Sequence, residues 1–200
     1  MSKKEKISVL LLGLRGSGKS SLVQRWLHPF EIPSCSETLA IEVTAQTTQV
    51  DDINYTVRFW DTAGAYYYDN LLEAYLYNTD CSVVVFDVTS LDSWSKAKYW
   101  VKKIVESNVI SKNDVPICIV SNKIDLESQR RVHKADVKKY IGEIASNRIV
   151  HCEASALTGE NTKLVYQLIL NFTKKPMKKV WTRHDVNPPS HTSQSNCLIV

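Results

Sequence analysis

No stretch of this 200-residue sequence approaches the roughly 18 consecutive apolar residues that a membrane-spanning helix requires. The sequence also lacks a leading apolar segment of the kind that directs secretion. Its five cysteines are odd in number and widely spaced, which does not suit a framework of disulfides. We therefore expect a reducing, cytosolic-side location, and any attachment to a membrane would be peripheral.

The chain also lacks a strong excess of charge of one sign, since its formal net charge is +4. The basic residues are concentrated near the two ends, at Lys3, Lys4, Lys6, Lys174, Lys175, Lys178, Lys179 and Arg183. This distribution favours an anionic membrane surface over a nucleic-acid groove, so we expect no nucleic-acid partner.

Short apolar, β-branched runs alternate with amphipathic stretches from Ile7 onward, a pattern typical of strands and crossover helices in a mostly parallel sheet. We expect strands over residues 7–12, 39–50, 55–60, 82–88, 116–120 and 148–152. We expect helices over residues 19–27, 71–77, 93–107, 134–145 and 162–172. The second and third strands alternate apolar with polar residues across a short connection, which predicts an antiparallel hairpin at a sheet edge.

These elements predict one α/β domain over residues 7–173, with a six-stranded, mostly parallel sheet flanked by helices on both faces. Cys81, Cys118 and Cys152 lie in or beside apolar runs, where a thiol behaves as a small buried hydrophobe. Residues 1–6 form a short basic extension. Residues 174–200 are expected to be a flexible basic tail, because Lys, Pro, Ser and Thr predominate there without apolar periodicity.

Residues 13–20, Gly-Leu-Arg-Gly-Ser-Gly-Lys-Ser, match the GxxxxGK[ST] phosphate loop between a strand and a helix, which predicts a P-loop NTPase domain. Glycines let main-chain N–H groups turn inward around phosphates, and the following helix adds its positive end. Lys19 can reach the β and γ phosphates, and the Ser20 hydroxyl can bind Mg²⁺. The candidates for binding phosphate are Gly13, Arg15, Gly16, Ser17, Gly18, Lys19 and Ser20.

The phosphate loop alone fits a kinase, an ATPase or a GTPase, so the residues that read the base decide between them. Asn122, Lys123 and Asp125 follow directly on an apolar strand. The carboxylate of Asp125 can accept both N1–H and N2–H of guanine, whereas adenine offers no matching pair of donors. We therefore expect guanine nucleotides, and a kinase or ATPase is disfavoured.

With these motifs in order, the chain resembles the Ras-like small GTPase superfamily from Ile7 to about Phe172, and within it the Rab family. The resemblance also rests on Asp-Thr-Ala-Gly at 61–64 and on Ser155-Ala156-Leu157. The Rab-like segments are residues 60–64, 86–90 and 158–161, together with Trp94 and Trp100, which we expect to be packing residues.

The resemblance implies roles for individual residues. Asp61 would hold Mg²⁺ through water, Gly64 would contact the γ-phosphate through its backbone, and Ser155, Ala156 and Leu157 would form the loop that reads guanine. Thr38, 18 residues after Ser20, would join Mg²⁺ when GTP is bound, with Ser34 and Ser36 as alternatives. Phe30 is the candidate for the aromatic residue over the guanine edge. Lys19, Thr38 and Gly64 form the candidate catalytic set.

The sequence departs from the family at two positions. The glutamine that usually follows Asp-Thr-Ala-Gly and orients the attacking water is Ala65 here, and a methyl group cannot hydrogen-bond water. Arg15 stands in the phosphate loop where relatives carry a small residue, and it would crowd an incoming arginine finger. Alternatively, Arg15 is itself a finger in cis. We predict slow GTP hydrolysis.

The last four residues, Cys-Leu-Ile-Val at 197–200, fit a prenylation box, which makes Cys197 the predicted lipidation site and leaves farnesyl or geranylgeranyl open. One lipid gives reversible binding, and the tail lysines would supply a second attraction. Tyr66, Tyr67 and Tyr68 would be partner contacts, inward-packing residues, or both.

The expected protein is a monomeric GTP/GDP switch on the cytoplasmic face of a membrane, and we expect it to act in vesicle trafficking. Its partners would be effectors, exchange factors and activating proteins. The alternative is a module that binds GTP with negligible hydrolysis.

Overall fold

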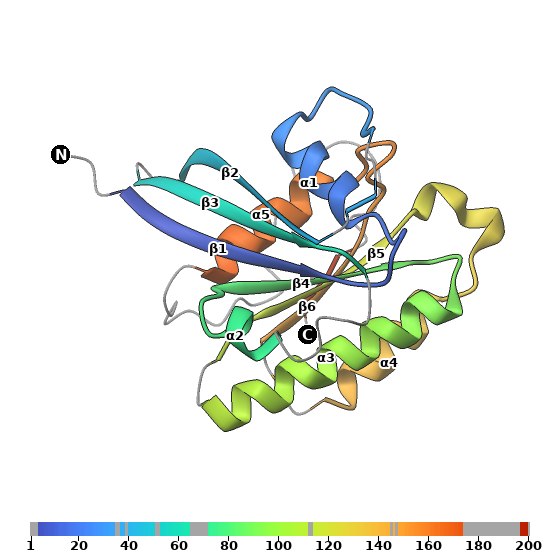
Figure 1. Cartoon of the computed structure of the whole chain (residues 1–200). Helices are drawn as coiled ribbons and strands as arrows, with labels where there is room; N and C mark the ends of the chain where they lie inside the picture. The colour runs from blue at the N-terminus through green and yellow to red at the C-terminus, as the bar shows by residue number, and fades with distance from the viewer. Residues whose placement is uncertain are drawn as a thin grey trace.

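A computed structural model of the chain describes residues 4–34, 37–38, 40–50, 53–64, 72–111, 114–144, 146, 148–173 and 197–199. Within these residues one β-sheet is covered by helices on both faces, which confirms the α/β prediction (Figure 1). The strands are β1 (Lys4–Leu12), β2 (Ile41–Val50), β3 (Ile53–Thr62), β4 (Cys81–Asp87), β5 (Ile117–Asn122), β6 (Ile149–Glu153) and β7 (Cys197–Ile199).

The strand order is β2-β3-β1-β4-β5-β6-β7. The five strands from β3 to β6 in this order are parallel to one another. β2 pairs antiparallel with β3, from Ile41 opposite Thr62 to Val50 opposite Ile53, so the predicted edge hairpin is confirmed. The six expected strands are therefore all present.

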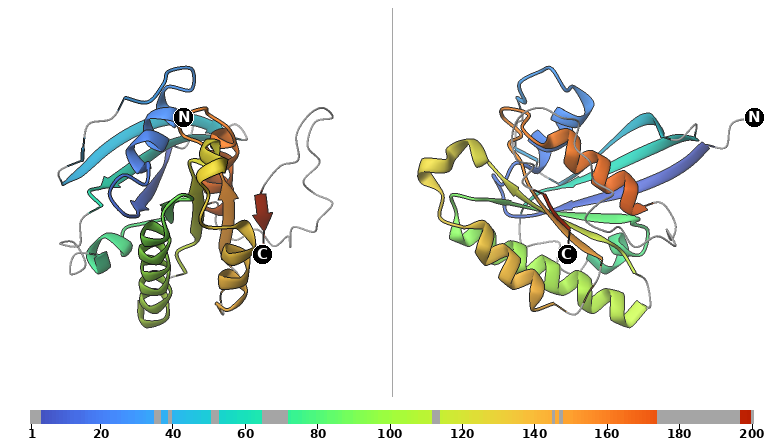
Figure 2. Two further views of the ribbon diagram at one scale, coloured as in Figure 1. Left: turned by 90° about the vertical axis from the view of Figure 1, so that its right-hand side faces the viewer. Right: turned by 180° about the vertical axis from the view of Figure 1, so that it is seen from behind.

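The helices are α1 (Lys19–Leu27), α2 (Leu72–Leu76), α3 (Leu91–Ser111), α4 (Lys134–Gly142) and α5 (Thr162–Thr173), with a 3₁₀ helix η2 (Ile124–Gln129) that the sequence did not predict. Helices α1 and α5 cover one face of the sheet, and α3 and α4 cover the other. Figure 2 shows these two pairs from two further sides.

Successive side chains of each strand point to opposite faces, so the sheet carries two apolar cores. In β1, Val9 and Leu11 pack towards α1 and α5, whereas Leu10 and Leu12 pack towards α3 and α4. Strands covered on both faces must be apolar at consecutive positions, which explains the unbroken apolar runs of β4 and β5. Cys81, Cys118 and Cys152 are buried, and so are the rings of Trp94 and Trp100, as predicted.

The C-terminal end of the chain adds one element to the expected sheet. β7 pairs antiparallel with β6, with Cys197 opposite Cys152 and Ile199 opposite Val150. Residues 174–196 lie outside the described part of the chain, so the flexible tail remains a prediction for them. Among the described residues, no helix has the length and apolar character needed to cross a bilayer.

Candidate nucleotide-binding site

The loop between β1 and α1 has the backbone that a phosphate loop needs. Gly16 and Gly18 have φ values of 76° and 94°, which L side chains rarely adopt. A Cβ added to Gly18 would lie 2.0 Å from Nδ2 of Asn122, and one added to Gly13 would lie 2.1 Å from the carbonyl oxygen of Val85. The loop is thus packed directly on the ends of β4 and β5, and only glycine fits at these contacts.

Lys19 is a buried cation at the start of α1, with 5% of its surface exposed. Its Nζ donates to the carbonyl oxygens of Gly13 at 3.1 Å and Leu14 at 3.3 Å, so the side chain folds back over the loop. Burial lowers the pKa of Lys19 to about 8, although the nearby Asp61 acts in the opposite direction. A phosphate bound in the loop would provide a countercharge for this amine.

Three side-chain oxygens that were predicted to serve magnesium lie together. Ser20 Oγ and Thr38 Oγ1 are 2.9 Å apart, Thr38 donates to Asp61 Oδ2 at 3.3 Å, and Ser20 also donates to Asp61 Oδ2. Asp61 Oδ1 is buried without a hydrogen-bond partner. Burial raises the pKa of Asp61, while the hydrogen bond from Ser20 and the charge of Lys19 oppose that rise.

This set of oxygens fits Mg²⁺, which prefers hard oxygen ligands and needs few protein groups when phosphate is present. An ion there would bind the unsatisfied carboxylate oxygen of Asp61 directly or through water. Elsewhere in the described ranges, no group of three His, Cys, Asp or Glu side chains could hold a metal ion.

Gly64 lies against the phosphate loop, as its expected contact with the γ-phosphate requires. A Cβ on Gly64 would lie 2.0 Å from the backbone nitrogen of Arg15. The next residues, Ala65 and Tyr66 to Tyr68, fall outside the described part of the chain.

The base-reading residues form a second cluster at the ends of β5 and β6. Ser155 Oγ donates to Asp125 Oδ1 at 2.5 Å, which fixes the carboxylate that is expected to read guanine. The Asn122 amide donates to the carbonyl oxygen of Ser17 at 2.9 Å and accepts from the N–H of Ala156 at 3.0 Å. One side chain therefore joins the phosphate loop to the loop of residues 155–157, called the base loop below.

Lys123 adopts φ 67° and its Nζ lies 2.7 Å from Asp87 Oδ2. Burial alone would raise the pKa of Asp87, but hydrogen bonds from Lys123 and Thr89 outweigh it, and the pKa is lowered. The resulting ion pair fixes Lys123 beside Asp125.

One predicted residue, Phe30, is not brought to these clusters. Phe30 is 100% exposed and packs on neither of them, so its contact with guanine stays a prediction. The N–H of Ala156 is engaged by Asn122, and Leu157 is 57% exposed. Of the alternatives to Thr38, Ser34 bonds to Gln24 through its main chain, and Ser36 is not among the described residues.

The structure also adds residues that the sequence did not single out. Arg15 pairs with Glu37, with Nη2 and Oε2 2.5 Å apart, and Asp87 holds Lys123. Arg25 contacts the base loop. The position of Glu37 just before Thr38 is a signal that could have been found, because an acidic residue there can reach an arginine of the phosphate loop.

Comparisons with known proteins agree with this geometry. The Ras family model matches residues 8–175. The chain is 32% identical over 175 residues to Ras-related protein Rab-5A from Dictyostelium discoideum, covering 88% of this chain and 83% of that relative. It is 33% identical over 163 residues to GTP-binding protein ypt5 from Schizosaccharomyces pombe, covering 80% and 74% respectively. Ras-related protein Rab-12 from Homo sapiens is 26% identical over 172 residues, covering 86% and 68%.

Proposed function

Because this chain belongs to the Ras family, as a small GTPase similar to Rab proteins, we propose that it is a switch that alternates between GTP and GDP during vesicle trafficking. The observation that carries the proposal is the double contact of Asn122, which joins Ser17 of the phosphate loop to Ala156 of the base loop. This contact would fix the loop that binds the phosphates at a set distance from the loop that binds the base of the same nucleotide.

The roles of the other residues follow from their chemistry. Lys19 would bind the β and γ phosphates, and the main-chain N–H groups from Gly13 to Ser20 would surround them. Ser20, Thr38 and Asp61 would hold Mg²⁺, which when bound neutralises phosphate charge. Gly64 would meet the γ-phosphate through its backbone. Asp125, supported by Ser155, would select guanine.

Base selection provides the direct test of the proposal. In Asp125→Asn, an amide donor can replace one carboxylate acceptor, and xanthine offers a carbonyl at the position where guanine carries its amino group. We expect GDP affinity to fall by at least roughly 100-fold and xanthosine diphosphate affinity to rise, because the amide donor of Asn would face an N–H donor of guanine. Equal binding of ATP and GTP by the unaltered protein would contradict the proposal.

We propose further that hydrolysis is slow, on account of Ala65 and Arg15. Ala65 cannot orient a water molecule. Arg15 points to Glu37, and the exposed fractions of the two side chains are 71% and 45%, so the pair is solvated and weak. Because Glu37 engages the exposed guanidinium, we favour crowding of an external arginine finger over a finger in cis.

A second candidate function is a module that holds GTP with negligible turnover, and Ala65 is the observation that favours it. Nucleotide content of the purified protein separates the two. GTP that remains bound and intact for hours would support the module, whereas release of phosphate over that time would support the switch.

Membrane attachment through Cys197 and the basic tail is also proposed. The Ras family model matches residues 8–175 and does not extend over the tail beyond them, so the support for this proposal is the tail's own sequence. Cys197 begins β7 and pairs with Cys152, so a tail that carries a lipid into a bilayer would have to leave β6.

A further inference from the structure

Arg25 is a buried cation on α1 that the chemistry of phosphate and magnesium binding does not use. Its exposed fraction is 7%. Among the described residues, no carboxylate forms an ion pair with it, and its partners are main-chain carbonyl oxygens. Burying a guanidinium costs free energy unless its donors are hydrogen-bonded, so the folded protein depends on the acceptors that surround Arg25.

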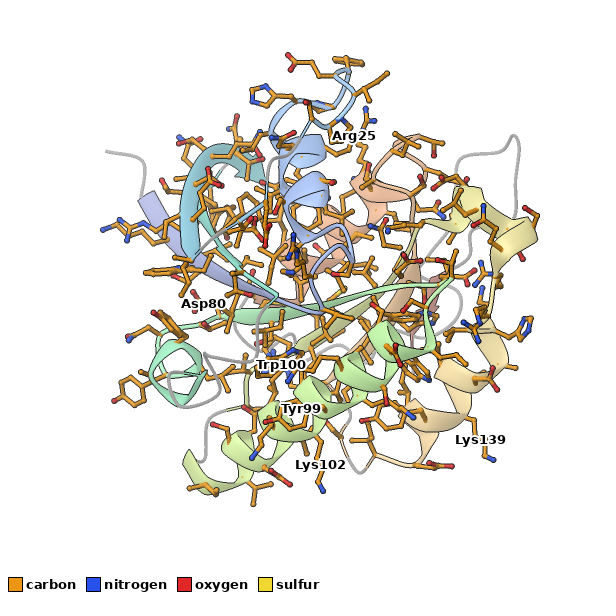
Figure 3. The ribbon with its side chains drawn as sticks, turned by 45° about the vertical axis from the view of Figure 1, so that its right-hand side comes forward. Arg25, Asp80, Tyr99, Trp100, Lys102 and Lys139 are labelled. Atoms are coloured by element: carbon orange, nitrogen blue, oxygen red, sulfur yellow. The ribbon has the colours of Figure 1, made fainter. Side chains whose placement is uncertain are left out.

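Its three partners belong to two segments, the base loop and the turn that follows α1. Nε donates to Ala156 at 3.0 Å and Nη2 donates to Leu157 at 2.5 Å, both in the base loop. Nη1 donates to Pro29 at 3.2 Å, directly before Phe30. Figure 3 shows Arg25 on the side of α1 that is turned towards the chain leading into α5.

The base loop is thereby held from two sides at one residue. The N–H of Ala156 donates to Asn122 at the end of β5, and the carbonyl oxygen of Ala156 accepts from Arg25 on α1. Ser155, the neighbour of Ala156, fixes the carboxylate of Asp125. A shift of Ala156 would therefore displace the group expected to read guanine.

We propose that Arg25 is a positioning residue that sets how strongly the base is read and how long the nucleotide stays bound. The inference rests on the proposed function, because it assumes a guanine nucleotide between the two loops. Helix α1 begins with Lys19 and Ser20, so Arg25 couples the helix at the phosphates to the loop at the base. Opening the base loop would leave a buried guanidinium without acceptors, which opposes release.

The test compares Arg25→Gln and Arg25→Lys with the unaltered protein, using fluorescent GDP and inosine diphosphate as probes. Hypoxanthine lacks the amino group of guanine, so the ratio of the two dissociation rates reports how well Asp125 reads the base. We expect Arg25→Gln to speed GDP release roughly tenfold. The dissociation rates of inosine diphosphate and GDP should then differ by a smaller factor than in the unaltered protein. Arg25→Lys keeps the charge but not the forked donors, so its dissociation rates should fall between those of the unaltered protein and those of Arg25→Gln.

Arg131→Gln is the matched control, since Arg131 is exposed and its backbone N–H bonds to Val88. Unchanged GDP release in both Arg25 variants would overturn the inference. So would equal acceleration for both nucleotides, because a purely structural role lowers the melting temperature without altering the ratio. If circular dichroism shows Arg25→Gln unfolded, Arg25→Lys decides. An unaltered protein that binds neither GDP nor GTP would instead sink the proposed function.

Discussion

Lys19 and Asp61 are a buried amine and a buried acid whose pKa values move towards the neutral forms. Burial lowers the pKa of Lys19 to about 8 and raises that of Asp61. Each group's charge stabilises the charged form of the other, yet desolvation is the larger cause of both pKa shifts. A site with these properties is completed by a ligand that brings both negative and positive charge, as a magnesium nucleotide does.

The pKa of Lys19 predicts a pH dependence of nucleotide binding. Bound phosphate would raise the pKa again, so above pH 8 binding requires uptake of a proton, and affinity falls as pH rises through that value. We expect GDP affinity to fall by up to roughly tenfold per pH unit above pH 8, measured by calorimetry.

Lys19→Arg is the control, because a guanidinium stays charged over this range. The guanine ring itself loses its N1 proton in alkali in both proteins, so the difference between them isolates Lys19. Parallel pH profiles for the two proteins would contradict the prediction.

The two departures in the phosphate site predict different responses of the intrinsic hydrolysis rate. Ala65→Gln restores a group that can orient water, so single-turnover GTP hydrolysis should rise by at least roughly tenfold. Arg15→Gly should leave the intrinsic rate unchanged, since Arg15 pairs with Glu37 and its crowding would act only on an incoming arginine finger. A drop in the rate of Arg15→Gly would instead establish the finger in cis.

Among single residues, side-chain motifs could be placed from the sequence and main-chain partners could not. Ser20, assigned from the phosphate-loop motif, and Thr38 and Asp61, assigned from the resemblance, have side-chain oxygens that lie within hydrogen-bond distance of one another. Two of the three partners of Arg25 are carbonyl groups of residues 131 and 132 positions away, and no pattern of side chains encodes them. Phe30 was assigned from a resemblance alone, and the structure leaves it exposed.

At the scale of elements, periodicity located the helices and strands because each buries one regular face. Helix α3 begins two residues before its predicted start, at Leu91. The Ser90 hydroxyl accepts from the N–H of Ser93 at 3.1 Å, which is the capping interaction that starts the helix. β7 and η2 carried no comparable signal, since one depends on pairing with a distant strand and the other is a single short coil.

The pairing of β5 with β6 contains a buried histidine that predicts acid sensitivity. His151 is 0% exposed, and its Nε2 lies 2.7 Å from the Ser121 hydroxyl. Burial lowers its pKa from 6.5 to about 4, with smaller effects from the charges of Lys134 and Arg130. The unfolded chain therefore takes up a proton between these pH values while the folded protein does not.

The free energy of unfolding should accordingly fall as pH drops from 6.5 to about 4, by on the order of 3 kcal/mol. Urea unfolding at a series of pH values measures this slope. His151→Gln should be less stable at neutral pH but show a flatter profile through the same window. Equal slopes in both proteins would show that other groups govern the acid transition.

At the scale of the whole molecule, the two proposed membrane signals can be separated. Cys197→Ser should move the protein from membranes to the soluble fraction of cells. Changing Lys174, Lys175, Lys178 and Lys179 to Gln should weaken binding of the lipidated protein to anionic vesicles by about 1 kcal/mol for each lysine near the surface, and leave binding to neutral vesicles unchanged. A membrane fraction that survives Cys197→Ser would refute the anchor.

Helix α1 is nine residues long, and an α-helix of that length is a stiff rod of about 13 Å. Lys19 and Ser20 stand at one end of this rod and Arg25 lies near the other. Tilting the rod from either end would loosen the hold on both halves of a nucleotide at once. A protein that catalyses nucleotide exchange would therefore need to displace only one end of α1 to release the nucleotide.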